Sequence, residues 1–194
     1  MLSASPGHAR RVGLLAAVTG TLLAACGSGA GTATGTPGQT APATASPVTA
    51  SASPLSPAQA AARLALAAYT GMWKEMQAAA VTADWTDPRL ASYASAEALQ
   101  ILVRGLRSDH TQGLVVKGTL VMHPKVISQK PSGNPDQVVI RDCSDDSHWL
   151  NYVAATGKLQ NNVPGGHRLV EALVTTAADR WTVSRLVVHA EGTC

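Results

Sequence analysis

Ser56-Pro57-Ala58-Gln59 opens the stretch that decides the fold, which reads SPAQAAARLALAAYTGMWKEMQAAAVT from residue 56 to residue 82. A serine, a proline directly after it and a glutamine three residues after the serine are typical of a helix start. Apolar residues then recur at steps of three and four, which places them on one helix face. They are Ala62, Leu66, Tyr69, Trp73, Met76 and Ala80. The stretch predicts a long amphipathic helix that ends near Thr82.

Two shorter helices are expected next. Asp87-Pro88 repeats the pattern of a capping residue followed by proline, and Leu90 and Tyr93 fall on one side of the turn that follows. Ser95 can cap a further helix, with Glu97 well placed in its first turn. The apolar stripe of this helix consists of Leu99, Leu102, Val103 and Leu106.

From Gly113 onward the apolar residues alternate, which is typical of strands. Gly118 interrupts the first strand as a candidate bulge. Farther along the chain, Ser144-Asp145-Asp146-Ser147 is expected to form a tight polar turn. A loop is expected at 157–166. The expected strands are 114–122, with 126–128 as a continuation, 137–143, 149–154, 167–176 and 181–189. Helices followed by a run of antiparallel strands indicate one α+β domain over residues 56–194.

The segment before this domain has a different composition. Residues 27–55 are almost entirely Gly, Ala, Ser, Thr, Pro and Gln, and no charged residue occurs between Cys26 and Arg63. Such a segment buries too little apolar surface to offset its conformational entropy. We therefore expect residues 26–55 to be a disordered tether with a reach of about 30 Å.

The first 25 residues have the features of a secretory signal. Arg10 and Arg11 precede an apolar run of small and aliphatic residues. Leu23-Ala24-Ala25-Cys26 resembles the lipobox of bacterial lipoproteins. The resemblance implies cleavage before Cys26 and attachment of a diacylglyceryl group to its thiol, so that the membrane is a partner through this lipid. An ordinary cleaved signal is the alternative, while the run is too short for a membrane-spanning helix.

Two further cysteines remain, Cys143 and Cys194. A pair of cysteines in an exported chain indicates a disulfide, and two free thiols are the alternative.

Charge excludes one class of partner. The chain has 15 basic and 12 acidic residues, and the predicted signal removes two of the basic ones. Because the remainder is nearly neutral and has no Lys/Arg cluster, we expect no nucleic-acid binding. No phosphate loop, nucleophile elbow or dinucleotide fingerprint occurs, so we expect no cofactor.

The order of elements resembles the nuclear transport factor 2-like superfamily, whose domains form a cystatin-like cone. Within it the chain looks like small actinobacterial lipoproteins of uncharacterised function. The likeness is carried by 67–73, 88–94, 123–126, 142–145, 181–183 and 192–194. It implies that the long helix and two short helices pack on a curved antiparallel sheet. It also implies that two copies could form a homodimer through that sheet.

Few residues stand out as candidates for chemistry. Tyr69, Trp73 and Tyr93 could line a pocket in the cone, although helix-face aromatics are more often core residues. The densest polar cluster consists of Asp142, Asp145, Asp146 and His148. We interpret it as a turn rather than a metal site, because its spacing matches no known metal-binding loop. The histidines show no paired ligand spacing.

Three functions remain open. The first is a non-enzymatic extracytoplasmic module, anchored to the outer face of the cell membrane, that binds a protein or small ligand. The second is a pocket enzyme of the isomerase or dehydratase type, for which Asp142, His110 and Asp84 are the candidate acids or bases. The third is a carrier of an apolar ligand.

Overall fold

Helix α1 (Pro57–Ala80) begins at the residue that the sequence predicts. The Ser56 hydroxyl accepts a hydrogen bond from the Gln59 backbone N–H at 3.2 Å, and Gln59 Oε1 accepts one from the Ser56 N–H at 2.9 Å. This reciprocal pair satisfies two N–H groups that have no partner within the helix. The computed structural model describes residues 54–194, so the predicted signal peptide and all but the last two residues of the predicted tether lie outside the described residues.

The two shorter helices are α2 (Leu90–Tyr93) and α3 (Ala96–Thr111). The expectation that the Ser95 side chain caps α3 is wrong, because it makes no hydrogen bond to the start of the helix. Its hydroxyl instead lies 2.8 Å from the Thr182 hydroxyl, and its backbone N–H donates to the Val183 carbonyl at 2.9 Å. Ser95 therefore ties the start of α3 to a strand at the edge of the sheet.

Five antiparallel strands form one sheet. Strand β3 pairs with β4 along one edge, and β4 pairs with β5. Both β1 and β2 pair with the other edge of β3, where β2 occupies its first third and β1 its last half. The strands are β1 (Leu114–Val121), β2 (Lys125–Lys130), β3 (Gln137–Val153), β4 (His167–Ala177) and β5 (Arg180–Glu191).

Strand β3 corrects a prediction. The segment from Ser144 to Ser147 is not a turn, because β3 continues through it for 17 residues. Polar residues inside a strand are tolerated here because the two that face the helices have partners. The Asp142 carboxylate accepts from Tyr69, and the Ser144 hydroxyl donates to the Arg168 carbonyl at 3.4 Å. The strand that was expected to end at residue 143 therefore connects the two halves of the sheet.

The predicted irregularity at Gly118 is present. The register of β1 against β3 shifts between Thr119 and Val121, one residue beyond Gly118. Gly118 has a φ of 108°, and a Cβ there would collide with the His148 carbonyl oxygen. Glycine is therefore required where β1 approaches the backbone of β3.

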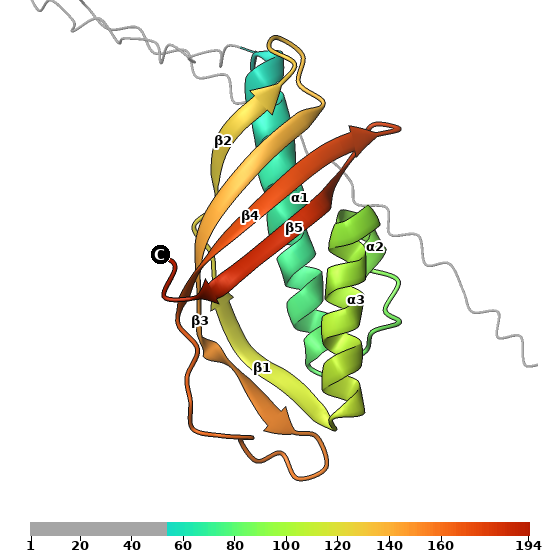
Figure 1. Cartoon of the computed structure of the whole chain (residues 1–194). Coiled ribbons are helices and arrows are strands. Elements are labelled where there is room, and N and C mark those ends of the chain that lie inside the picture. Colours follow the sequence, from blue (N-terminus) through green and yellow to red (C-terminus); the bar gives the residue numbers. More distant parts are fainter. Residues whose placement is uncertain (1–53) are drawn as a thin grey trace, which may run out of the picture. The chain divides into compact units, whose positions relative to one another are not determined.

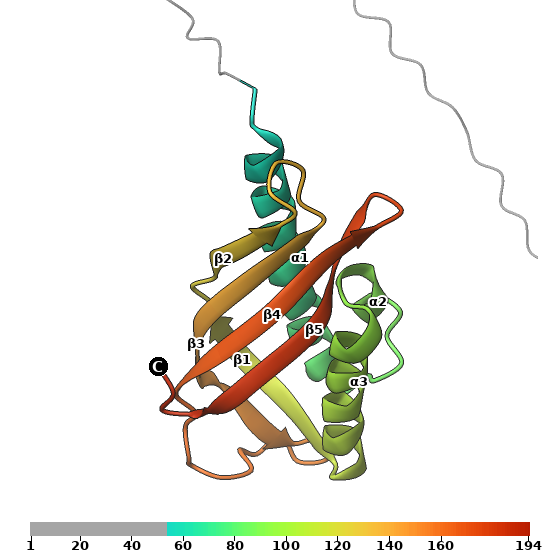
Figure 2. The ribbon, with the colours of Figure 1, turned by 45° about the horizontal axis from the view of Figure 1, so that its top comes forward.

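All three helices cover one face of the sheet, and the sheet curves around α1 (Figures 1 and 2). The α+β fold with helices on a curved antiparallel sheet is thereby confirmed. Within residues 54–194 no helix is both long and apolar enough to cross a membrane. The largest fully buried apolar side chains between the layers are Tyr69, Met72, Leu90, Leu106, Ile140, Leu186, Val138, Val170, Val174 and Val183.

Candidate functional site

A small pocket lies on the open face of the sheet, the face that the helices do not cover. Ile140 and Asp142 point toward the helices, so the alternation of β3 turns Arg141 and Cys143 to the open face. The pocket has a volume of about 240 Å³. We call it the basic-rimmed pocket, and its lining consists of His123, Lys125, Ile127, Arg141, Cys143, Leu169 and Cys194.

A row of charged residues crosses the sheet at one end of this pocket. Lys125 of β2 lies directly opposite Arg141 of β3, and Arg141 lies opposite Glu171 of β4. The Arg141 guanidinium donates to a Glu171 carboxylate oxygen at 2.9 Å, and His189 Nε2 lies 3.1 Å from the other oxygen. Hydrogen bonds from Arg141 and His189 lower the pKa of the Glu171 carboxyl. Glu171 therefore holds the guanidinium at the rim of the pocket.

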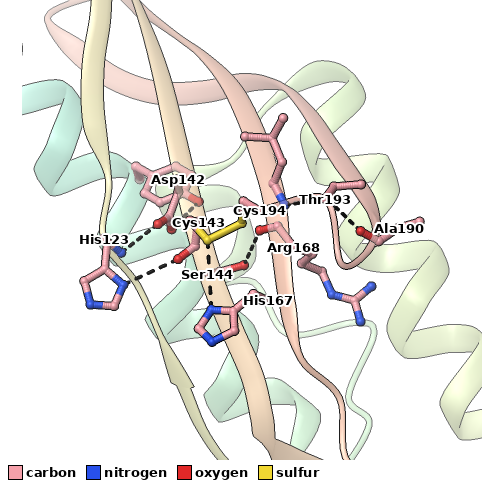
Figure 3. Close-up of a disulfide and its surroundings, with 11 residues drawn as sticks. His123, Asp142, Cys143, Ser144, His167, Arg168, Ala190, Thr193 and Cys194 are labelled. Atoms are coloured by element: carbon pink, nitrogen blue, oxygen red, sulfur yellow. Dashed lines mark hydrogen bonds between the residues drawn. A yellow bond between two sulfur atoms is a disulfide. The ribbon is translucent and has the colours of Figure 1, made fainter.

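The disulfide between Cys143 and Cys194 forms another part of the lining (Figure 3). Its Cα atoms are 5.8 Å apart, and it has the pairing that the sequence predicts. The chain end is also held by Thr193, whose hydroxyl accepts from the Leu169 N–H at 2.9 Å and donates to the Ala190 carbonyl at 2.7 Å. The disulfide is therefore a fixed apolar surface next to Leu169.

Asp142 lies directly behind the pocket and is only 1% exposed. Its Oδ2 accepts from the Tyr69 hydroxyl at 2.9 Å, and its Oδ1 accepts from the His123 backbone N–H at 2.6 Å. Burial, and then the charge of Asp142, raise the pKa of the Tyr69 hydroxyl. Because both carboxylate oxygens are engaged inside the protein, Asp142 positions His123 and α1 rather than facing a substrate.

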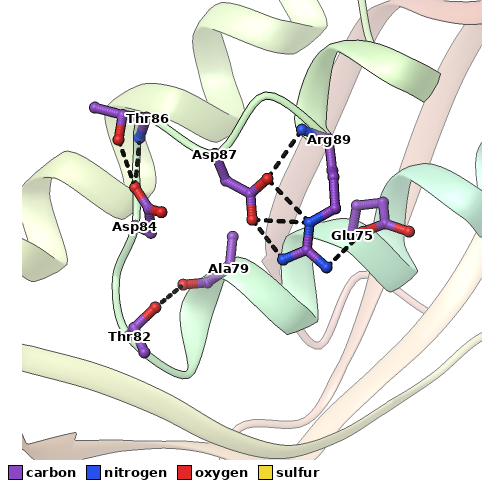
Figure 4. A network of polar contacts seen from close by, with 7 residues as sticks. All are labelled: Glu75, Ala79, Thr82, Asp84, Thr86, Asp87 and Arg89. Atoms are coloured by element: carbon purple, nitrogen blue, oxygen red, sulfur yellow. Dashed lines mark hydrogen bonds and ion pairs between the residues drawn. The ribbon is translucent and has the colours of Figure 1, made fainter. Parts of the chain in front are cut away.

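The other two candidates for an acid or base lie elsewhere. Asp84 and His110 line one open hollow of about 330 Å³, together with Trp85. Asp84 Oδ1 accepts hydrogen bonds from the Thr86 N–H and hydroxyl at 3.0 and 2.7 Å (Figure 4). This oxygen therefore stabilises the loop between α1 and α2, as does the neighbouring Asp87–Arg89 pair.

The three aromatic candidates for a pocket have different surroundings. Tyr69 is completely buried and Trp73 is 6% exposed, and their rings meet edge to face at 6.4 Å. Trp73 makes the same kind of contact with Trp149 at 6.3 Å. Tyr93 is 36% exposed and covers Gly71 of α1. Tyr69 and Trp73 are thus core residues, and the larger hollows among residues 54–194 are lined by other side chains.

The residues of the predicted acidic cluster lie in β3 and do not share one site. Asp142 is buried, whereas Asp145 accepts from the Ser147 N–H at 2.9 Å and has a lowered pKa because of the hydrogen bonds from Ser147. Asp146 pairs with Arg168 at 2.8 Å and accepts from the Gly166 N–H at 2.7 Å, which fixes the end of the 157–166 loop. Among residues 54–194 no three His, Cys, Asp or Glu side chains are placed to hold a metal ion.

A larger groove of about 650 Å³ lies near the start of α1. It runs between α1 and the β2–β3 and β4–β5 turns, and its charged lining groups are Asp136 and Asp179. Trp181 and Leu64 are the largest apolar side chains in its lining.

Sequence reasoning missed the residues that give the basic-rimmed pocket its charge. Lys125 and Arg141 come together only through the register of β2 against β3. Ile127, which lies between two lysines in the sequence, is 51% exposed in β2. Its exposure could not be inferred before the open face was known.

Comparison with known proteins bears on the fold and not on the function. No family model and no curated protein matches the chain. The intermembrane space region of the chloroplast protein ARC6 is similar in structure, with a TM-score of 0.50 and 17% identity, over 67% of this chain and 97% of that one. A protein of unknown function with a cystatin-like fold from Nostoc punctiforme matches with a TM-score of 0.41 and 11% identity, over 66% of this chain and 91% of that one.

Proposed function

We propose that this chain is a lipid-anchored extracytoplasmic module that binds its partner on the surface of the cone and catalyses no reaction. The anchor is inferred from the resemblance of Leu23-Ala24-Ala25-Cys26 to a lipobox. The mode of binding is inferred from the filled interior, which is the observation that carries the proposal. Tyr69, Met72 and Ile140 fill the space between the helices and the sheet, and none of them is more than 1% exposed.

The two alternative functions find less support. An isomerase or dehydratase needs an acid or base that reaches a substrate, and Asp142 is buried with both oxygens bonded to Tyr69 and His123. A carrier of an apolar ligand needs an internal cavity, and the same packed core fills that region. Surface recognition requires neither, and the open face offers a pocket with apolar and basic groups.

Metabolic labelling with an alkyne-bearing fatty acid tests the anchor. The wild-type chain, expressed in a bacterium that processes lipoproteins, is expected to take up the label and to be digested by protease added to intact cells. Cys26→Ser should abolish labelling, whereas Cys143→Ser/Cys194→Ser should not. An unlabelled wild-type chain in the soluble fraction would contradict the proposal.

A further inference from the structure

We propose that the basic-rimmed pocket binds a small organic anion, with its carboxylate at Lys125 and Arg141 and its apolar part on Ile127, Leu169 and the disulfide. The inference deepens the proposed binding function, because it names the class of ligand. The anchor does not depend on this pocket, so the labelling experiment and the experiment below can fail separately.

The first argument is the placement of two cations opposite each other. Lys125 and Arg141 form a direct cross-strand pair, and like charges in this arrangement destabilise a sheet. The Glu171 carboxylate neutralises the charge of Arg141 but forms no ion pair with Lys125. Lys125 makes no ion pair with any residue between 54 and 194. An anion bound between the ammonium and the guanidinium would relieve this repulsion, and it would receive charge-assisted hydrogen bonds from both.

The second argument is that two polar groups of the rim, Arg141 and His123, are held in place. Glu171 orients the Arg141 guanidinium from the side away from Lys125, because the three residues form one row across the sheet. The His123 backbone is fixed by Asp142, and its ring Nδ1 lies 3.4 Å from the Cys143 carbonyl oxygen (Figure 3). Side chains that are already positioned lose little conformational entropy when a ligand binds.

The third argument is the apolar floor between these groups. Ile127 is half exposed although it lies in a strand, and Leu169 and the disulfide lie on the same face. The pocket volume of about 240 Å³ is smaller than the roughly 300–1,000 Å³ of pockets for drug-sized ligands. The ligand is therefore a compact acid, such as an aryl or short alkyl carboxylate.

Calorimetric titration of the full chain, held in nanodiscs of neutral phosphatidylcholine, tests this assignment. The probes are 4-phenylbutyrate, its uncharged amide and the corresponding 4-phenylbutylamine, which share one apolar body. We expect the carboxylate to bind about tenfold more tightly than the amide, and the amine to bind least, because hydrogen bonds to charged groups contribute most.

Lys125→Gln is expected to weaken binding of the carboxylate about tenfold and to leave that of the amide unchanged. Lys130→Gln is the matched control, since this lysine ends the same strand outside the pocket. Ile127→Ser should weaken binding of both probes. Equal affinity for all three probes, or an unchanged affinity in Lys125→Gln, would overturn the proposal. Binding of the unlipidated Cys26→Ser chain to vesicles that contain anionic phosphatidylglycerol, without binding of 4-phenylbutyrate, would also overturn it, since the site would then recognise a membrane surface.

Discussion

At the scale of single residues, the Tyr69–Asp142 hydrogen bond joins α1 to the middle of the sheet. Tyr69→Phe removes the donor and leaves a buried carboxylate oxygen without this partner. We expect the free energy of unfolding, measured in urea, to fall by about 1–3 kcal/mol. Tyr93→Phe is the control, since the Tyr93 hydroxyl has no hydrogen-bond partner within residues 54–194, and it should change stability by less than about 0.5 kcal/mol. Equal effects of the two changes would show that the buried bond has no structural role.

Glu171 allows a test of the charge row by titration. Its folded-state pKa lies below its ordinary value of 4.5, first because of Arg141 and then because of His189. A carboxyl with a lowered pKa stabilises the fold fully above its unfolded pKa, and this contribution is lost as the pH falls through the folded pKa. We therefore expect wild-type stability to decrease below about pH 4.5 partly through this group.

Arg141→Gln should raise the pKa of Glu171 toward the ordinary value, as measured by NMR of the side-chain carboxyl carbon. The control is Arg89→Gln, because Arg89 pairs with Asp87 in the loop before α2. A Glu171 pKa that is the same in wild type and Arg141→Gln would mean that the row does not form in solution.

At the scale of elements, Gly71 lets α2 pack closely on α1. A Cβ at this position would lie 2.7 Å from the nearest ring atoms of Tyr93. Gly71→Ala should therefore destabilise the protein, although alanine favours helix by up to about 1 kcal/mol. In the Tyr93→Ala background the same change should become stabilising. A double-mutant cycle by thermal unfolding measures this coupling, and additive effects would contradict the packing account.

The elements also show how far the sequence determines the fold. Helix α1 and strands β4 and β5 could be predicted because their capping and alternation are local properties. Strand β3 could not be predicted as one strand, because the partners of Asp142 and Ser144 are distant in sequence. The basic-rimmed pocket depends on the pairing of β2 with β3, so no local pattern could predict it.

At the scale of the whole molecule, the Cys143–Cys194 disulfide links the end of the chain, after β5, to the middle of β3. The two cysteines are 51 residues apart, and the chain-entropy model gives a stabilisation of about 4 kcal/mol for a loop of this length. We expect Cys194→Ser to lower the free energy of unfolding by up to this amount in chemical denaturation. Cys26→Ser, the control for loss of a cysteine, should leave it unchanged, and an equally stable Cys194→Ser would contradict a structural role.

The central claim is that recognition occurs on the open face of the sheet while the interior stays closed. The chain has three isoleucines, and they report on separate regions. Ile127 lies in the basic-rimmed pocket, Ile140 lies in the core, and Ile101 lies on α3. The most direct measurement is therefore ¹³C-methyl NMR of isoleucine-labelled protein during titration with 4-phenylbutyrate. The account predicts a saturable shift of the Ile127 methyl signal with Ile140 and Ile101 unchanged, whereas a shift of Ile140 without Ile127 would contradict it.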